Sequence, residues 1–149
     1  MKRFHFRLDR VLQLRESAEA DAAREVATAQ LAAERATAQA GAAERALLHA
    51  VAQTAASAQG ETVGVLNAMR LSLDAARERV TEASAVRVQA EAVVEQQLDR
   101  WRSARAERQA LEKLRTQRKD AWTVDANRAE QADIDEVALR RRLGLGEHA

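Results

Sequence analysis

The sequence contains no cysteine, no proline and no tyrosine, and its 149 residues include only two phenylalanines and two tryptophans. Without cysteine the chain has neither a disulfide framework nor a thiolate metal site, which suits a reducing compartment. Without proline, no residue of this kind interrupts a long helix. The few bulky aromatic side chains leave mainly scattered leucine and valine to form a core, so an ordinary globular domain is not expected.

Glycine is also scarce, and its positions divide the chain. Of five glycines, Gly60 and Gly64 lie close together near the middle, and two others lie beyond residue 143. Glycine is the usual residue of turns and helix ends, whereas the alanine and charged residues that fill the rest favour helices. We therefore predict a single coiled-coil domain over residues 1–149, with helices at about 6–57 and 64–142, a turn at about 58–63 and a tail at 143–149.

Long apolar runs are missing as well. No stretch approaches the roughly 20 apolar residues that span a bilayer, and the start Met-Lys-Arg-Phe has no apolar run of a secretory signal. We expect a cytosolic protein.

Apolar residues recur at alternating steps of three and four along both predicted helices, the spacing of a coiled-coil seam. In the first helix the stripe is made of small residues: Ala18, Ala22, Val26, Ala29, Ala33, Ala36, Ala40, Ala43, Leu47 and Ala50. In the second it is bulkier: Leu66, Met69, Leu73, Ala76, Val80, Ala83, Arg87, Ala90, Val94, Leu98, Trp101, Leu111 and Leu114.

The two stripes fit each other if the chain folds back near Glu61 and Thr62, so that residues i and j face each other where i + j is about 123. Small residues then mostly oppose larger ones, as Ala22 opposes Trp101. Two alanine-rich helices from separate chains would bury too little surface. We therefore predict an all-α fold, a long two-helix antiparallel coiled-coil hairpin within one chain, and favour a monomer, although a dimer of hairpins stays open.

The second predicted helix is longer than the first. The residue that faces Met1 in this register is Trp122, so the second helix overhangs the first at residues 123–142. This overhang must be solvated, frayed or held by another protein.

Charge is unevenly placed, although the net charge is only +1. Residues 1–15 hold five Lys or Arg residues and one Asp. Residues 100–119 hold eight Lys or Arg residues and two Glu. The fold-back places both basic blocks at one end. Residues 16–99 are net acidic, and residues 120–139 hold six acids and one Arg. Local fields of this kind steer partners more than total charge does.

The sequence offers no catalytic constellation. His5, His49 and His148 lie in separate regions, with no pair at the i, i+4 spacing of a helical metal site. The segment Gly60-Glu-Thr-Val-Gly64 lacks the lysine of a phosphate-binding loop, and a hairpin turn explains its glycines. We expect no enzyme activity, no cofactor and no metal.

The first residues carry a recognisable pattern. Phe-x-Phe-Arg-Leu-x-x-Val-Leu-x-Leu-Arg-Glu, which is formed by Phe4, Phe6, Arg7, Leu8, Val11, Leu12, Leu14, Arg15 and Glu16, resembles the N-terminus of the flagellar export protein family FliJ. Trp101-Arg102, then Leu111-Glu-Lys-Leu114 and the polar stretch to Arg142, are similar to the C-terminal half of that family.

This resemblance implies a non-enzymatic component of the bacterial flagellar type III export apparatus, at the cytoplasmic face of the inner membrane. Family members look like the central stalk of rotary ATPases: the basic end enters the pore of the hexameric export ATPase, promotes its assembly and activity, and links it to the membrane export gate and to export chaperones. By that resemblance the ring-facing residues are Arg3, Phe4, Phe6, Arg7, Arg10, Arg15, Arg115, Arg118, Lys119 and Trp122. The start of the second helix, residues 69–83, is alanine-rich, and we assign no gate contacts there.

Two alternatives stay open: a purely structural coiled-coil scaffold, and a binder of nucleic acid or anionic membranes through the basic end. Against the second, the basic blocks lack the interleaved aromatics that stack single-stranded bases and the apolar face of an interfacial helix. We expect neither a nucleic-acid partner nor a small-molecule substrate.

The two phenylalanines pose a choice of their own. On a helix, residues 4 and 6 point roughly 200° apart, so both share a face only where the backbone is extended. If the helix begins after them, Phe4 can pack against Trp122 and Lys119 and pin the open end. Otherwise at least one phenylalanine is an exposed anchor for a partner.

Overall fold

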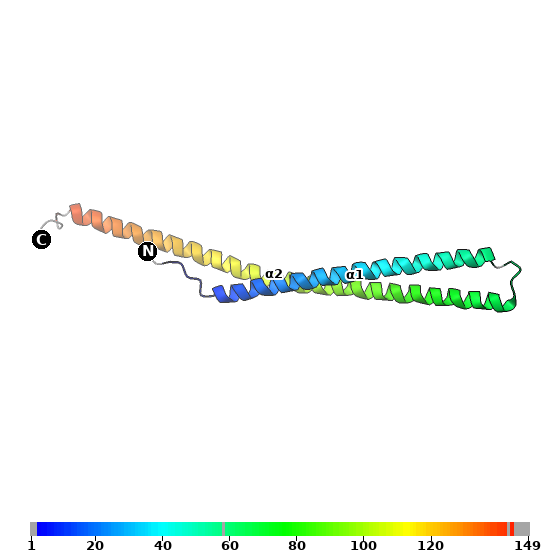
Figure 1. The fold of residues 1–149 in the computed structure, drawn as a ribbon. Helices are drawn as coiled ribbons and strands as arrows, with labels where there is room; N and C mark the ends of the chain where they lie inside the picture. Colours follow the sequence, from blue (N-terminus) through cyan, green and yellow to red (C-terminus); the bar gives the residue numbers. More distant parts are fainter. Residues whose placement is uncertain (1–2, 58, 143, 145–149) are drawn as a thin grey trace. The chain divides into compact units, whose positions relative to one another are not determined.

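The computed structural model describes residues 3–57, 59–142 and 144. These residues form two helices, α1 (Asp9–Ser57) and α2 (Val63–Arg142), and no strand (Figure 1). The predicted all-α helical hairpin is confirmed. The first helix was predicted from about residue 6, whereas α1 begins three residues later. The predicted tail lies outside the described residues except for Gly144.

The chain divides into two compact units. One is formed by residues 19–104, which include the hairpin turn. The other joins the residues up to 18 with those from 105 onward. The single coiled-coil domain over residues 1–149 stays a prediction.

The helix ends follow from local sequence. The first turn of α1 carries Asp9, whose negative charge suits the positive end of the helix dipole. At the start of α2, the hydroxyl of Thr62 accepts a hydrogen bond from the backbone N–H of Val65 at 3.5 Å, in the manner of an N-cap. Between the helices, Gly60 has a φ of 84°, a backbone conformation that residues with a side chain rarely adopt. The glycine-containing turn therefore separates the two helices as the sequence indicates.

In the unit of residues 19–104, the small-residue stripe of α1 is the best buried element. Ala29, Ala36 and Ala40 are buried, with exposed fractions of 7%, 4% and 3%. The α2 stripe from Met69 to Trp101 is only half-buried, and no described residue of α2 is fully buried. Small side chains let the helices approach closely, while the longer α2 side chains reach past them to the edge of the seam. Two ends of the predicted stripes, Ala18 and Leu66, are exposed.

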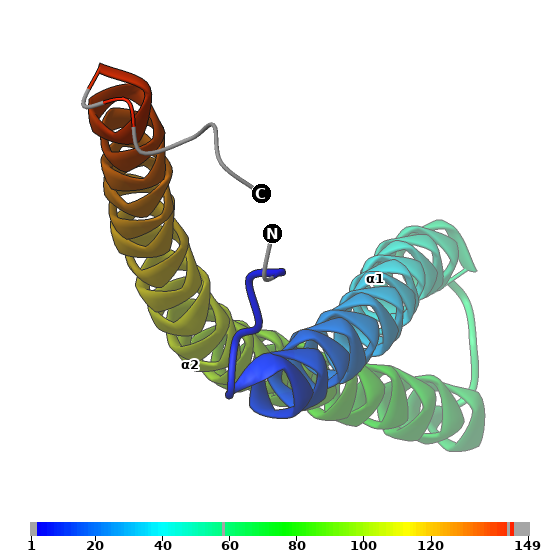
Figure 2. The same ribbon diagram turned by 90° about the vertical axis from the view of Figure 1, so that its left-hand side faces the viewer.

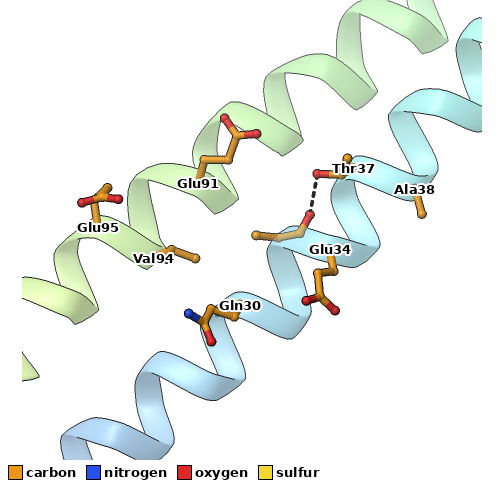
Figure 3. A pocket seen from close by; sticks show the side chains of 8 residues that line it. Gln30, Glu34, Thr37, Ala38, Glu91, Val94 and Glu95 are labelled. Carbon is orange, nitrogen blue, oxygen red and sulfur yellow. Dashed lines mark hydrogen bonds between the residues drawn. The ribbon is translucent and has the colours of Figure 1, made fainter.

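A shallow hollow on this unit shows the register directly (Figure 3). Gln30 and Ala33 of α1 line it together with Val94 of α2, whose side chain points toward α1. The neighbouring Thr37 hydroxyl donates a hydrogen bond to the carbonyl of Ala33 at 2.9 Å and so stays within its own helix. The residue numbers of Gln30 and Val94, and those of Ala33 and Glu91, each sum to 124, within one of the predicted register.

The α2 stripe from Met69 to Trp101 has one charged member, Arg87. Its Nε atom is buried without a hydrogen-bond partner among the described residues, and the nearest carboxylate oxygen, of Glu91, is 3.7 Å away. A buried donor without a partner costs stability. The guanidinium remains partly exposed, with 42% of the side chain accessible, which limits that cost.

We expect Arg87→Met to raise the free energy of unfolding by about 1 kcal/mol, because methionine keeps the unbranched stem and removes the unpaired donor. Urea unfolding followed by circular dichroism measures it. Arg79→Met, at an exposed position of the same helix, is the matched control and should change stability by less than about 0.5 kcal/mol. Equal effects from both changes, or a loss of stability from Arg87→Met, would contradict this account of the seam.

Candidate functional site

Residues 3–6 are extended and lead into the start of α1 (Figure 1). Figure 2 shows the same segment from another side. Phe6 is 5% exposed, and the ring of Phe4 lies against that of Trp122, with centroids 6.0 Å apart and planes tilted by 55°. Tilted aromatic pairs at this distance are favourable. The expectation that Phe4 packs against Trp122 is therefore confirmed. This contact holds the first residues against α2 at the open end of the hairpin.

Two of the predicted site cations form ion pairs between the helices, although about half of each side chain stays exposed (48% for Arg15 and 51% for Arg115). Arg15 forms an ion pair with Glu107, and the Nε of Arg115 lies 3.6 Å from the carboxylate of Asp9. The residue numbers of these pairs sum to 122 and 124, so both lie within one residue of the predicted register. Leu12, which is 3% exposed, lies between them along α1. Arg15 and Arg115 thus join the two helices across the seam.

The remaining predicted cations are free to meet a partner. They are exposed and have no ion-pair partner among the residues that the structure describes: Arg3, Arg7, Arg10, Arg118 and Lys119. We call these five residues the basic cluster. Exposed cations that are not used within the fold keep their full attraction for carboxylates of another protein.

An open cleft separates the extended segment from α2. Its volume is about 580 Å³, with Phe4, Phe6 and Trp122 forming apolar walls and with Arg7 and Arg118 at its edge. Lys119, which the sequence placed beside Phe4, does not line this cleft. Trp122 remains 37% exposed, so one aromatic ring and several cations share a single accessible surface.

The described residues offer no second kind of site. They contain no group of three or more His, Cys, Asp or Glu side chains that could hold a metal ion. His5 and His49 are exposed on different parts of the chain, and His148 lies outside the described residues. No described helix is long and apolar enough to cross a membrane.

The described residues thus form a helical hairpin that carries an exposed basic cluster. Residues 4–144 match the family model described as "Flagellar FliJ protein", and the chain belongs to this family. The resemblance seen at both ends of the sequence is thereby confirmed. No curated protein and no solved structure matches the chain.

Membership places the chain among the non-catalytic components of the flagellar protein-export apparatus. Its partners therefore belong to that apparatus. Which surface meets which partner is a separate question, and the geometry of the basic cluster bears on it.

Proposed function

We propose that the chain acts as a central stalk and adaptor of the export apparatus, and that its basic end binds the hexameric export ATPase. Bound there, it promotes assembly and activity of the ATPase and links it to the export gate and to export chaperones, at the cytoplasmic face of the inner membrane. The observation that carries this proposal is the basic cluster: five exposed cations without partners among the described residues, on an end that aromatic packing fixes.

Preorganisation of the basic end favours this contact. Phe6 and the Phe4–Trp122 pair fix the path of the first residues along α2, so Arg7 and Arg118 are presented together without further ordering. A polar ring lined with carboxylates would be attracted to this end at long range and held in one register by the same charges.

We expect the triple change Arg7→Glu, Arg10→Glu and Arg118→Glu to weaken binding to the purified ATPase hexamer by tenfold or more, because three attractive charges become repulsive. Titration of the labelled full chain with the hexamer measures the dissociation constant. The matched control, Arg35→Glu, Arg45→Glu and Arg79→Glu, makes the same charge change at exposed positions of the other unit. It should leave affinity within about twofold.

Two outcomes would overturn the proposal. Equal loss in the triple variant and its control would show that total charge alone decides binding. Recovery of the ATPase from lysate that disappears after nuclease treatment would favour the nucleic-acid alternative. The rate of ATP hydrolysis distinguishes a stalk from a purely structural scaffold. A stalk should raise this rate when the chain is added to the ATPase, whereas a scaffold should leave it unchanged.

A further inference from the structure

The part of α2 beyond Trp122 has no α1 beside it. The first residue of α1, Asp9, lies next to Arg115, while α2 runs on to Arg142. Every described residue from 123 to 142 is exposed except Ala126, which is half-exposed. Most helical stability in proteins comes from packing, and this part of α2 has little packing within the described residues. This segment therefore has the features of a helix that lacks its partner.

One side of the segment carries an apolar stripe. Two adjoining hollows of about 630 and 350 Å³ share Glu130 and Asp133 in their walls. The apolar residues along them are Trp122, Ala126, Ala129, Ile134, Val137 and Ala138. From Trp122 to Val137 they recur at steps of three or four with a single step of five, and Ile134 and Val137 are 56% and 50% exposed. A stripe with this spacing accepts the ridge of a second helix.

The charge around the stripe from Trp122 to Val137 is negative. Residues 120–139 hold six acidic residues and one arginine, a net charge of −5. Three arginines, Arg140, Arg141 and Arg142, follow, and Arg141 lines the far end of the second hollow. Asp125, Glu130 and Asp133 all line the hollows. Within the unit that joins the residues up to 18 with those from 105 onward, α1 is joined to α2 by Arg15 with Glu107 and by Asp9 with Arg115, cation against carboxylate beside an apolar seam. A helix that packs in the same way against residues 123–142 should therefore carry cations on its flanks.

We propose that the overhang face, the stripe from Trp122 to Val137 with Asp125, Glu130 and Asp133 beside it, binds a basic amphipathic helix of a partner protein. That helix takes the place beside α2 that α1 leaves at Asp9 and continues the two-helix seam. The site has the opposite charge to the basic cluster, so it selects a different partner surface, although the two sites adjoin at Trp122. A second copy of this face is a poor occupant, because it would bring carboxylates against carboxylates.

A defined peptide tests this chemistry with the full chain. The probe is a labelled synthetic peptide of three heptads, with leucine and alanine on its seam and lysine on both flanks, and the matched peptide carries glutamate in place of lysine. Fluorescence anisotropy should show binding of the lysine peptide and at least about tenfold weaker binding of the glutamate peptide.

Matched variants of the chain locate the site. Glu130→Lys with Asp133→Lys should weaken binding of the lysine peptide by about tenfold or more. Asp135→Lys with Glu136→Lys makes the same charge change at residues that line neither hollow, and should change it by less than about twofold. Ile134→Ser with Val137→Ser should weaken binding without altering charge. Circular dichroism verifies that each variant keeps its helix content.

Three results would overturn the proposal. The first is an equal loss in both charge variants, which would mean diffuse attraction. The second is comparable binding of the glutamate peptide. The third is a dimer of the chain in light scattering that Ile134→Ser with Val137→Ser converts to a monomer, which would assign the face to a second copy.

Discussion

Phe6→Ala should release the open end of the hairpin. Among the described residues of its unit, Phe6 and Leu12 are the two well-buried large side chains. Removing a buried phenylalanine ring costs about 3 kcal/mol or more, and no neighbouring aromatic can fill the space while Phe4 remains against Trp122. We expect faster amide exchange in residues 9–18 and a lower urea midpoint, measured by hydrogen–deuterium exchange mass spectrometry and circular dichroism.

The control for this change is Leu14→Ala, which removes an apolar side chain that is 69% exposed. It should shift stability by less than about 0.5 kcal/mol. If Phe6→Ala leaves exchange in residues 9–18 unchanged, the ring does not hold α1 to α2, and the fixed presentation of the basic cluster loses its physical basis.

The double change Ala36→Leu with Ala40→Leu should destabilise the other unit by roughly 2 to 5 kcal/mol, because each added isobutyl group must enter a seam closed to a few per cent exposure. The two positions are one helical turn apart, so their effects need not add. Thermal unfolding followed by circular dichroism measures the loss.

Ala38→Leu with Ala42→Leu is its counterpart, with the same chemistry and spacing at exposed positions of α1. These changes should leave stability nearly unaffected. A gain in stability from Ala36→Leu with Ala40→Leu would mean that the seam has room for larger side chains, and would refute close approach of the two helices as the reason for the alanine stripe.

The register of the hairpin could be predicted from sequence because it depends on spacing alone. Alanines at steps of three and four in one helix and larger residues in the other fit only when they oppose each other, and the pairs Arg15–Glu107 and Asp9–Arg115 lie where that register puts them. Applying the register to charges as well as to apolar residues would have found both pairs. The start of α1 was less predictable, since the extended segment is held by packing of Phe6 and not by local propensity.

The candidate site could be predicted only in outline. Clustering of Lys and Arg at one end follows from the fold-back, but which cations are free depends on which acids lie within reach. Arg15 and Arg115 are paired, whereas Arg7 and Arg118 are not paired with any described residue. The stripe prediction also passed over Ala104 and Arg108, which continue the half-buried face of α2 between Trp101 and Leu111. An arginine in that position does not match an apolar pattern, although its long stem can cover apolar surface.

The central claim is that the basic end of this chain enters a complex with the hexameric export ATPase. A crosslinking map of the full chain with the purified hexamer tests it most directly, with a photoreactive amino acid introduced singly along both helices and identification of the joined peptides by mass spectrometry. The account predicts that crosslinks to the ATPase concentrate in residues 3–18 and 105–122 and disappear in the triple variant Arg7→Glu, Arg10→Glu and Arg118→Glu. Crosslinks concentrated near the hairpin turn, around residues 50–73, with the basic end unmodified, would contradict it.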